Sequence, residues 1–178
     1  MLADSDVQSV ADLRGRKIAL GSVGSTSKHL APMQVLKDHG LDPLSEVEVV
    51  HTSIKLGWEA LKRGDVAAMA TTDDKFLKLR EQEEELEPGA FRVIARSRDL
   101  PNDVLLVQPD VDAAVVANLR QAFLDHSAEL VAAILQGEDN QKYRGMKFLA
   151  NAQDSDYDYV RAMYATIGHS KLAQFVDE

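Results

Sequence analysis

A chain of 178 residues with 45% hydrophobic and 28% charged residues has the composition of an ordinary soluble globular protein with a sizeable core. Its formal net charge of −9 argues against a broad nucleic-acid or anionic-membrane surface, but it allows one bound anion, because amides and hydroxyls act locally. The absence of cysteine excludes disulfides and thiolate chemistry, and no apolar run is long enough to span a bilayer.

Strands and helices are predicted to alternate over the first half of the chain. Apolar or alternating runs predict strands at 17–21, 46–52, 66–71, 91–97 and 104–109. Helical periodicity predicts helices at 26–39, at 54–64, from 72 onward, and again from 112 toward the end. Gly40 and Gly64 stand where a left-handed residue ends a helix. This order indicates an α/β fold with a mainly parallel sheet flanked by helices.

The stretch "KIALGSVGSTSKHLAP", residues 17–32, leads from a predicted strand through glycines and hydroxyl residues into a predicted helix. It is not a P-loop, because that motif places glycine directly before its lysine, and here Ser27 precedes Lys28. It is not a dinucleotide-binding G-x-G-x-x-G either, because Gly21 and Gly24 are three residues apart. Both nucleotide-binding interpretations therefore fail on spacing.

Two other interpretations of this stretch remain open. In the first, Ser25, Thr26 and Ser27 place hydroxyls beside the unpaired amides of a helix start, which together suit a tetrahedral oxyanion. In the second, Ser25 is only the N-cap of the helix and the glycines only shape the turn. The spacing permits an anion site without requiring one.

The sequence contains no complete motif for metal binding or catalysis. The five histidines form no H-x-x-x-H or H-x-H pair. Asp154, Asp156 and Asp158 have the spacing of a calcium loop, but Tyr159 stands where that loop needs glycine. No cofactor motif and no nucleophile–histidine–acid arrangement is found, so we expect neither a cofactor nor an enzyme. Trp58 is predicted to lie in the core.

Three longer segments carry a resemblance to a known family. They read "DLRGRKIALGSVGSTSKHLAPMQVLKDHGLDP", "GWEALKRGDVAAMAT" and "RVIARSRDLPNDVLLVQPDV". In the same order, they are similar to segments of the phosphate/phosphite/phosphonate-type substrate-binding proteins of ABC transporters. That family has a D-L-x-G-[KR] turn, a strand and G-S-T-S-G-x-L-x-P, then a helix with N-G-x-V-D-A, and later S-x-x-I-P-N-D. The chain resembles the family over nearly its whole length.

The resemblance implies two α/β lobes that close on a ligand. Residues 1–98 would form the second, anion-gripping lobe, and 99–178 would form the returning segment of the first lobe. The ligand contacts that it implies are Ser25, Thr26 and Ser27, which would grip the anion, and Asn102 and Asp103, which would line the cleft.

The chain departs from the family pattern at three places. Lys28 stands where the family usually has glycine. The family's ligand-contacting histidine, near the start of the helix after the second strand, is replaced by Ile54 or Lys55. After the third strand the family has an acidic residue at a fixed position, and this chain has Thr71, Thr72 and Asp73 in that region, so no single residue matches it. We therefore expect an oxyanion ligand but leave phosphate, phosphite and phosphonate open.

The resemblance also implies partners and a location. It implies the solute-binding component of an ABC importer, with a permease as partner, in the periplasm; the chain's own start lacks the features of a signal peptide. Family members carry a further part of the first lobe before the D-L-x-G turn, so we expect a sheet edge exposed at Val104–Gln108 and a homodimer or domain swap through it. A sensory domain of a signalling protein, or an enzyme on the same scaffold, are the alternatives.

Overall fold

The computed structural model describes residues 1–173, with only the backbone of Lys142, and the chain forms two units by its internal contacts. The first unit is Met1–Leu100 with Tyr157–Glu178, and the second unit is Pro101–Asp156. The assignment of 1–98 and 99–178 to two lobes stays a prediction, and its last residues, 174–178, lie outside the described residues.

The elements of the first unit are β1 (Lys17–Leu20), α1 (Ala31–Asp38), β2 (Glu48–His51), α2 (Ile54–Arg63), β3 (Ala68–Met69), α3 (Asp73–Glu81) and α6 (Asp158–Thr166), with a π-helix at Thr26–Leu30 and 3₁₀ helices at Val10–Leu13 and Ser170–Ala173. The second unit holds α4 (Ala113–Asp125), α5 (Ser127–Ile134) and a 3₁₀ helix at Glu138–Tyr143. A further 3₁₀ helix, Asp154–Tyr157, spans the boundary between the units. None of the helices within residues 1–173 has the length and apolar character needed to cross a bilayer.

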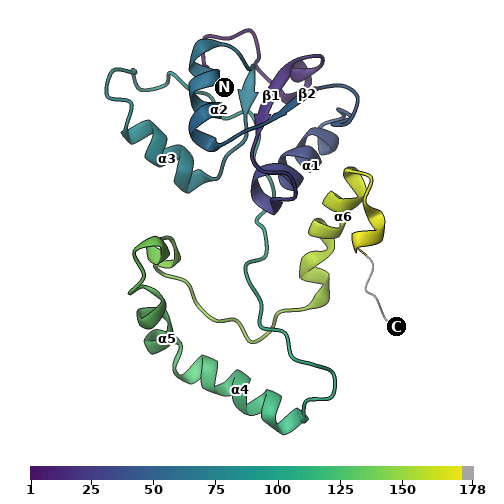
Figure 1. Cartoon of the computed structure of the whole chain (residues 1–178), viewed down its shortest axis with the longest axis vertical. Coiled ribbons are helices and arrows are strands. Elements are labelled where there is room, and N and C mark those ends of the chain that lie inside the picture. Colours follow the sequence, from purple (N-terminus) through teal and green to yellow (C-terminus); the bar gives the residue numbers. More distant parts are fainter. Residues whose placement is uncertain (174–178) are drawn as a thin grey trace. The chain divides into compact units, whose positions relative to one another are not determined.

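A parallel sheet in the order β2-β1-β3 organises the first unit. Side chains alternate along β1, so Ile18 and Leu20 join the core cluster that includes residues of α1, whereas Ala19 packs against Leu61 of α2. Figure 1 shows α1 and α2 on opposite sides of this sheet. The predicted α/β class and the first three predicted strands are confirmed.

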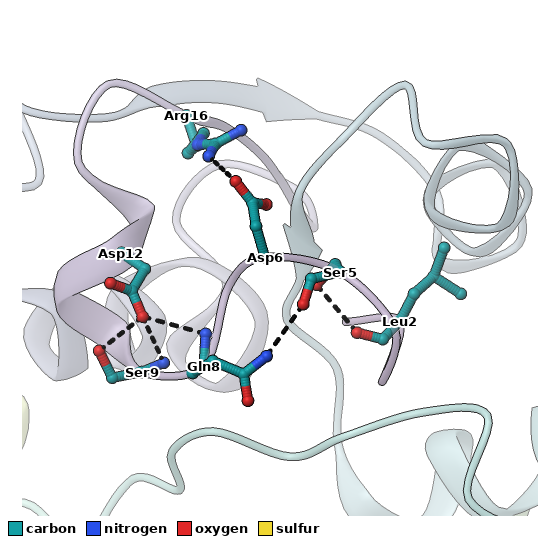
Figure 2. A network of polar contacts seen from close by, with 7 residues as sticks. All are labelled: Leu2, Ser5, Asp6, Gln8, Ser9, Asp12 and Arg16. Atoms are coloured by element: carbon teal, nitrogen blue, oxygen red, sulfur yellow. Dashed lines mark hydrogen bonds and ion pairs between the residues drawn. The ribbon is translucent and has the colours of Figure 1, made fainter.

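The segment before β1 is held by local polar contacts, drawn in Figure 2. The Asp12 carboxylate accepts hydrogen bonds from the amides of Gln8 (3.0 Å) and Ser9 (2.8 Å) and from the Ser9 hydroxyl (2.9 Å). The Gln8 amide bond lowers the pKa of Asp12 most, followed by the Ser9 contacts. Arg16 pairs with Asp6 across the same turn. These contacts stabilise the turn that directly precedes β1, which begins at Lys17.

Helix α6 packs against α1 through a buried polar pair. The Thr166 hydroxyl donates to Gln34 Oε1 at 2.5 Å, and Gln34 Nε2 donates to Asp38 at 2.7 Å. Leu30 and Met163, both fully buried, pack together in the same interface. A residue at the far end of the chain thereby supports the helix that follows the Ser-Thr-Ser stretch.

The two later predicted strands do not form. Of 91–97, Phe91 alone makes a bridge, to Leu2, and the predicted strand 104–109 has no ladder, with Val104–Val107 largely exposed. A strand needs a neighbour along its length, but Met1–Ala3 forms backbone hydrogen bonds with only residues 90–92 of the first run, and within residues 1–173 no strand pairs with the second run. The strand predictions are therefore wrong, and the sheet edge expected at Val104–Gln108, on which the homodimer or domain swap would depend, is not formed.

Candidate functional site

The carboxyl ends of the three parallel strands meet at one edge of the sheet. There, β1 runs into Gly21, β2 into Thr52 and Ser53, and β3 into Thr71 and Thr72. The register pairs Leu20 with His51, so the residues that follow β1 and β2 lie side by side. Ligands of parallel α/β sheets bind outside the carboxyl ends of the strands. This edge is the candidate site.

The start of the loop after β1 is joined to the following helix by a backbone hydrogen bond. The Gly21 amide donates to the Lys28 carbonyl at 2.8 Å. That carbonyl is available because its usual helical partner would be the amide of Pro32, and proline has none. A Cβ on Gly21 would lie 2.6 Å from the Lys28 Cβ, so only glycine fits this close approach. We call Gly21–Ser25 the glycine–serine loop.

The helix predicted from residue 26 begins with a π-turn rather than an α-turn. The Ser25 carbonyl accepts from the amides of both His29 (2.9 Å) and Leu30 (3.0 Å), and the Ala31 amide donates to the Thr26 carbonyl. Pro32 has no N–H to donate to the Lys28 carbonyl, so the regular α-helical bond is missing here, which is compatible with a wider turn. Helix α1 continues from this turn. Single π-turns of this kind are frequent at functional sites.

Ser25 is the N-cap of this helix, as the second interpretation predicted. Its Oγ accepts from the Lys28 amide at 3.3 Å. A hydroxyl has one donor and two acceptor lone pairs, so capping leaves the O–H group available to donate. Capping and anion binding are therefore compatible roles for the same side chain.

The next two residues present further donors. The amides of Thr26 and Ser27 make no hydrogen bond within residues 1–173, as expected for the first positions of a helix. Ser25, Thr26, Ser27 and Lys28 are all half-buried. The structure thus brings three hydroxyls and two unpaired amides together in one turn, at the positive end of the helix dipole.

Two histidines that the spacing did not connect meet beside this loop. The rings of His29 and His51 lie 4.7 Å apart between centroids, edge to face. Gly24 donates its amide to Nδ1 of His29 at 3.0 Å, and Nδ1 of His51 lies 2.7 Å from the Gly21 carbonyl. The sequence indicated only that His51 lies near the end of a predicted strand. Its contact with His29 depends on the parallel register between β1 and β2, which the sequence does not show.

His29 is only 6% exposed. Burial lowers its pKa below the ordinary value, and the charge of His51 lowers it further. The ring is therefore kept neutral beside the loop.

A cavity of about 430 Å³ lies within the first unit and includes Ser27 in its lining. Most of the lining is apolar, with the aromatic rings of Trp58, Phe76 and Phe91 among it. Thr71 also lines it, and its hydroxyl oxygen is buried without a hydrogen-bond partner in the described part of the chain. Trp58 is 2% exposed, which confirms its predicted place in the core.

The remaining predicted contacts belong to the other unit. Asn102 and Asp103 are both exposed and lie at the start of the second unit, whereas Ser25, Thr26 and Ser27 lie in the first. Their role as ligand contacts stays a prediction.

Comparisons with known proteins address the fold and the family. A family model described as "ABC transporter, phosphonate, periplasmic substrate-binding protein" matches residues 1–157. Among solved structures, the chain is similar to the alkanesulfonate-binding protein SsuA from Xanthomonas axonopodis pv. citri bound to MOPS, with 16% sequence identity and a TM-score of 0.52. The match covers 98% of this chain and 64% of that one, so the chain spans less than two thirds of that protein's length. This likeness confirms the predicted periplasmic-binding-protein-like fold.

Proposed function

The chain belongs to the phosphonate family of periplasmic substrate-binding proteins of ABC transporters, and from this premise we propose that it binds a small phosphonate- or sulfonate-type oxyanion for import. The proposal places the protein in the periplasm and makes an ABC permease its partner. The family is one of binding proteins, and the proposed mechanism is capture without chemistry on the ligand.

One observation carries the proposal: a turn that combines the hydroxyls of Ser25, Thr26 and Ser27 with two unpaired amides at the carboxyl end of the central strand. Tetrahedral oxyanions need several donors arranged around them, and hydrogen bonds to a charged group are stronger than neutral ones. The donors of this turn are held in place before the ligand arrives, by Gly21, Pro32 and the Ser25 cap. Little ordering entropy is then lost on binding.

The cavity favours one type of ligand. Because Ser27 belongs both to the donor turn and to the lining of a largely apolar cavity, we propose that the ligand carries an apolar substituent on its phosphorus or sulfur. A cavity of about 430 Å³ is within the range of small-ligand sites, about 300–1,000 Å³. Organic phosphonates or sulfonates are then expected to bind more tightly than inorganic phosphate or sulfate.

Asn102 and Asp103 enter the proposal through their match to the family's P-N-D motif alone. Asp103 would accept from a protonated anion oxygen or from an ammonium group on the ligand. An Asp103→Asn variant is expected to alter the preference between methylphosphonate and 2-aminoethylphosphonate, while leaving the fold unchanged, since the side chain is exposed.

The test is a calorimetric titration of the ligand-stripped chain with phosphate, phosphite, methylphosphonate, 2-aminoethylphosphonate, phenylphosphonate, methanesulfonate and sulfate. The decisive variants are Ser25→Asp and Ser25→Asn, because both side chains are strong N-caps and differ by one charge. We expect both to remain folded and Ser25→Asp to lose binding, because its carboxylate faces the anion.

A second pair separates the hydroxyls of the donor turn from the loop in general. The double variant Thr26→Val/Ser27→Ala is expected to weaken binding about tenfold to hundredfold per lost charge-assisted bond. Ser22→Ala, in the exposed part of the loop, is the control. Equal affinity of Ser25→Asp and Ser25→Asn for every anion would contradict the proposed site.

A further inference from the structure

The glycine–serine loop is held at two backbone groups by two histidines from different elements. His29, on the π-helix, contacts the Gly24 amide, and His51, at the end of β2, contacts the Gly21 carbonyl. The two rings also contact each other. The loop that leads into the donor turn is therefore fastened at its first and fourth residues by side chains that pack together.

The partners of the two rings fix their tautomers. An amide N–H can only donate, so Nδ1 of His29 must carry a lone pair, and the proton of the neutral ring lies on Nε2. A carbonyl oxygen can only accept, so Nδ1 of His51 must carry a proton. The two histidines therefore have opposite tautomers.

We propose that His29 and His51 are positioning residues that hold the glycine–serine loop in its anion-binding geometry, and that protonation of His29 releases the loop. This inference deepens the proposed function and rests on it for its link to ligand binding. A protonated His29 has no lone pair for Gly24, and its Nδ1–H would face the amide N–H at 3.0 Å. The Nδ1–H of His51 can donate to the Gly21 carbonyl in both the neutral and the protonated ring. Only the contact between His29 and Gly24 therefore depends on protonation.

The surroundings of His29 set the direction of the pH effect. From β2, His51 faces the ring, and a positive charge on His51 would oppose protonation of His29. From its own element the neighbour is Lys28. Asp38 of α1 and Tyr159 of α6, on the helices packed against the π-helix, contact each other instead.

The folded-state pKa of His29 is depressed, so neutral His29 contributes stability that is fully present above its ordinary value of 6.5. That contribution is lost as the pH falls below 6.5 and through the folded-state pKa. We therefore expect the loop to be fastened at neutral pH and released in acid.

The first test needs no ligand and is independent of the proposed function. Long-range ¹H–¹⁵N correlation spectra of the full chain at neutral pH report the tautomer of each imidazole. We expect the Nε2–H form for His29 and the Nδ1–H form for His51. The same tautomer in both rings, or a protonated His29 at pH 7.5, would overturn the inference.

The second test compares two substitutions of the same buried ring. His29→Asn keeps an acceptor close to the place of Nδ1, whereas His29→Phe keeps a ring without one. We expect hydrogen exchange of the Gly24 amide to stay slow in His29→Asn and to become at least about tenfold faster in His29→Phe, the factor of one ordinary hydrogen bond. Methylphosphonate affinity should follow the same order, and in His29→Asn it should no longer fall as the pH decreases.

The outcomes separate the two proposals. If no anion binds the wild type but the tautomers and the Gly24 exchange are as expected, the loop-holding role stands and the proposed function fails. If methylphosphonate binds and His29→Phe matches His29→Asn in both exchange and pH profile, the positioning role is wrong. Should His29→Phe fail to fold by circular dichroism, the wild-type tautomers and His29→Asn still decide the question.

Discussion

The first and second units of this chain bury their apolar residues to very different extents. The fully buried apolar side chains of the described residues lie in the first unit, around the sheet and beneath α6. In the second unit, α4 and α5 bury none, and side chains such as Leu106 and Leu119 stay exposed. The polar contacts differ in the same way: Gln34 meets Thr166 across the first unit, whereas Gln121 meets Asp125 one helical turn away.

This difference shows which forces act on each unit. A helix forms its backbone hydrogen bonds within a few residues, so α4 and α5 need no distant segment to supply the partners of those bonds. A parallel sheet forms only when distant segments meet, and burial between its two covering helices stabilises it. The candidate site lies in the unit with that tertiary packing, beside the buried His29 and Leu30.

The largest expected contrast comes from making one substitution in each unit. Leu61 is 1% exposed and Leu106 is 88% exposed. Leu61→Ala should lower the free energy of unfolding by about 2–5 kcal/mol, because it leaves a cavity between α2 and the sheet. Leu106→Ala should change it by less than about 0.5 kcal/mol. Urea titrations measure both, and a comparable loss in Leu106→Ala would show that the second unit has a core of its own.

Two glycines offer a matched test of close packing. Gly21→Ala should cost about 1–3 kcal/mol, because its Cβ would meet the Lys28 Cβ at 2.6 Å, where the helix backbone leaves no room. Gly137→Ala, in the second unit, would meet the Nδ2 end of Asn140 at 2.7 Å, which can rotate away. The loss there is limited to the Asn140 bond to the Ile134 carbonyl, about 1 kcal/mol. Equal thermal shifts in the two variants would refute the tight closure of the glycine–serine loop.

A local cap should matter most in the second unit. Asp112 accepts from the amides of Ala114 (2.8 Å) and Val115 (3.4 Å) at the start of α4. Asp112→Ala should destabilise α4 by about 1 kcal/mol, seen as faster amide exchange in its first turn, while exchange in β1 stays unchanged. Asp110→Ala is the control, because Asp110 precedes the cap. A change in β1 exchange would mean that the two units unfold together.

The smallest effect concerns a polar contact of the first unit. Glu83 has a side chain only 19% exposed and accepts from Trp58 Nε1 (2.6 Å) and Lys62 Nζ (2.7 Å). The Lys62 bond first, and then the Trp58 bond, lower the pKa of Glu83 below its ordinary value of 4.5. Its contribution to stability is therefore present above pH 4.5 and is lost as the pH falls through the folded-state value.

Glu83→Gln keeps an acceptor for Trp58 and removes the charge opposite Lys62. We expect a loss of about 0.5 kcal/mol at pH 7 and a smaller loss at pH 3, measured by urea unfolding at both values. The neighbouring Glu84→Gln, at an exposed position, is the control and should behave like the wild type. A loss in Glu83→Gln that does not depend on pH would exclude the ionised pair.

The sequence by itself determined the features that depend on neighbouring residues. Ser25 as a cap, Gly64 with its φ of +76° after α2, the first three strands and the α/β order were all predictable, because each signal acts within a turn or along one strand. The family was also recognisable, since its motifs are short and stand in order along the chain. The donor turn could be proposed from these signals alone.

Only the tertiary structure decided which segments found partners. The runs at 91–97 and 104–109 have strand-like sequences, but among residues 1–173 neither has a neighbouring strand, so their backbones form no ladder there. His29 and His51 are 22 positions apart, and they meet because β2 pairs with β1 in a particular register. Glu83 likewise leaves the solvent because the fold brings it to Trp58. Pairing between distant segments depends on the packing of the whole unit, which no local pattern of residues contains.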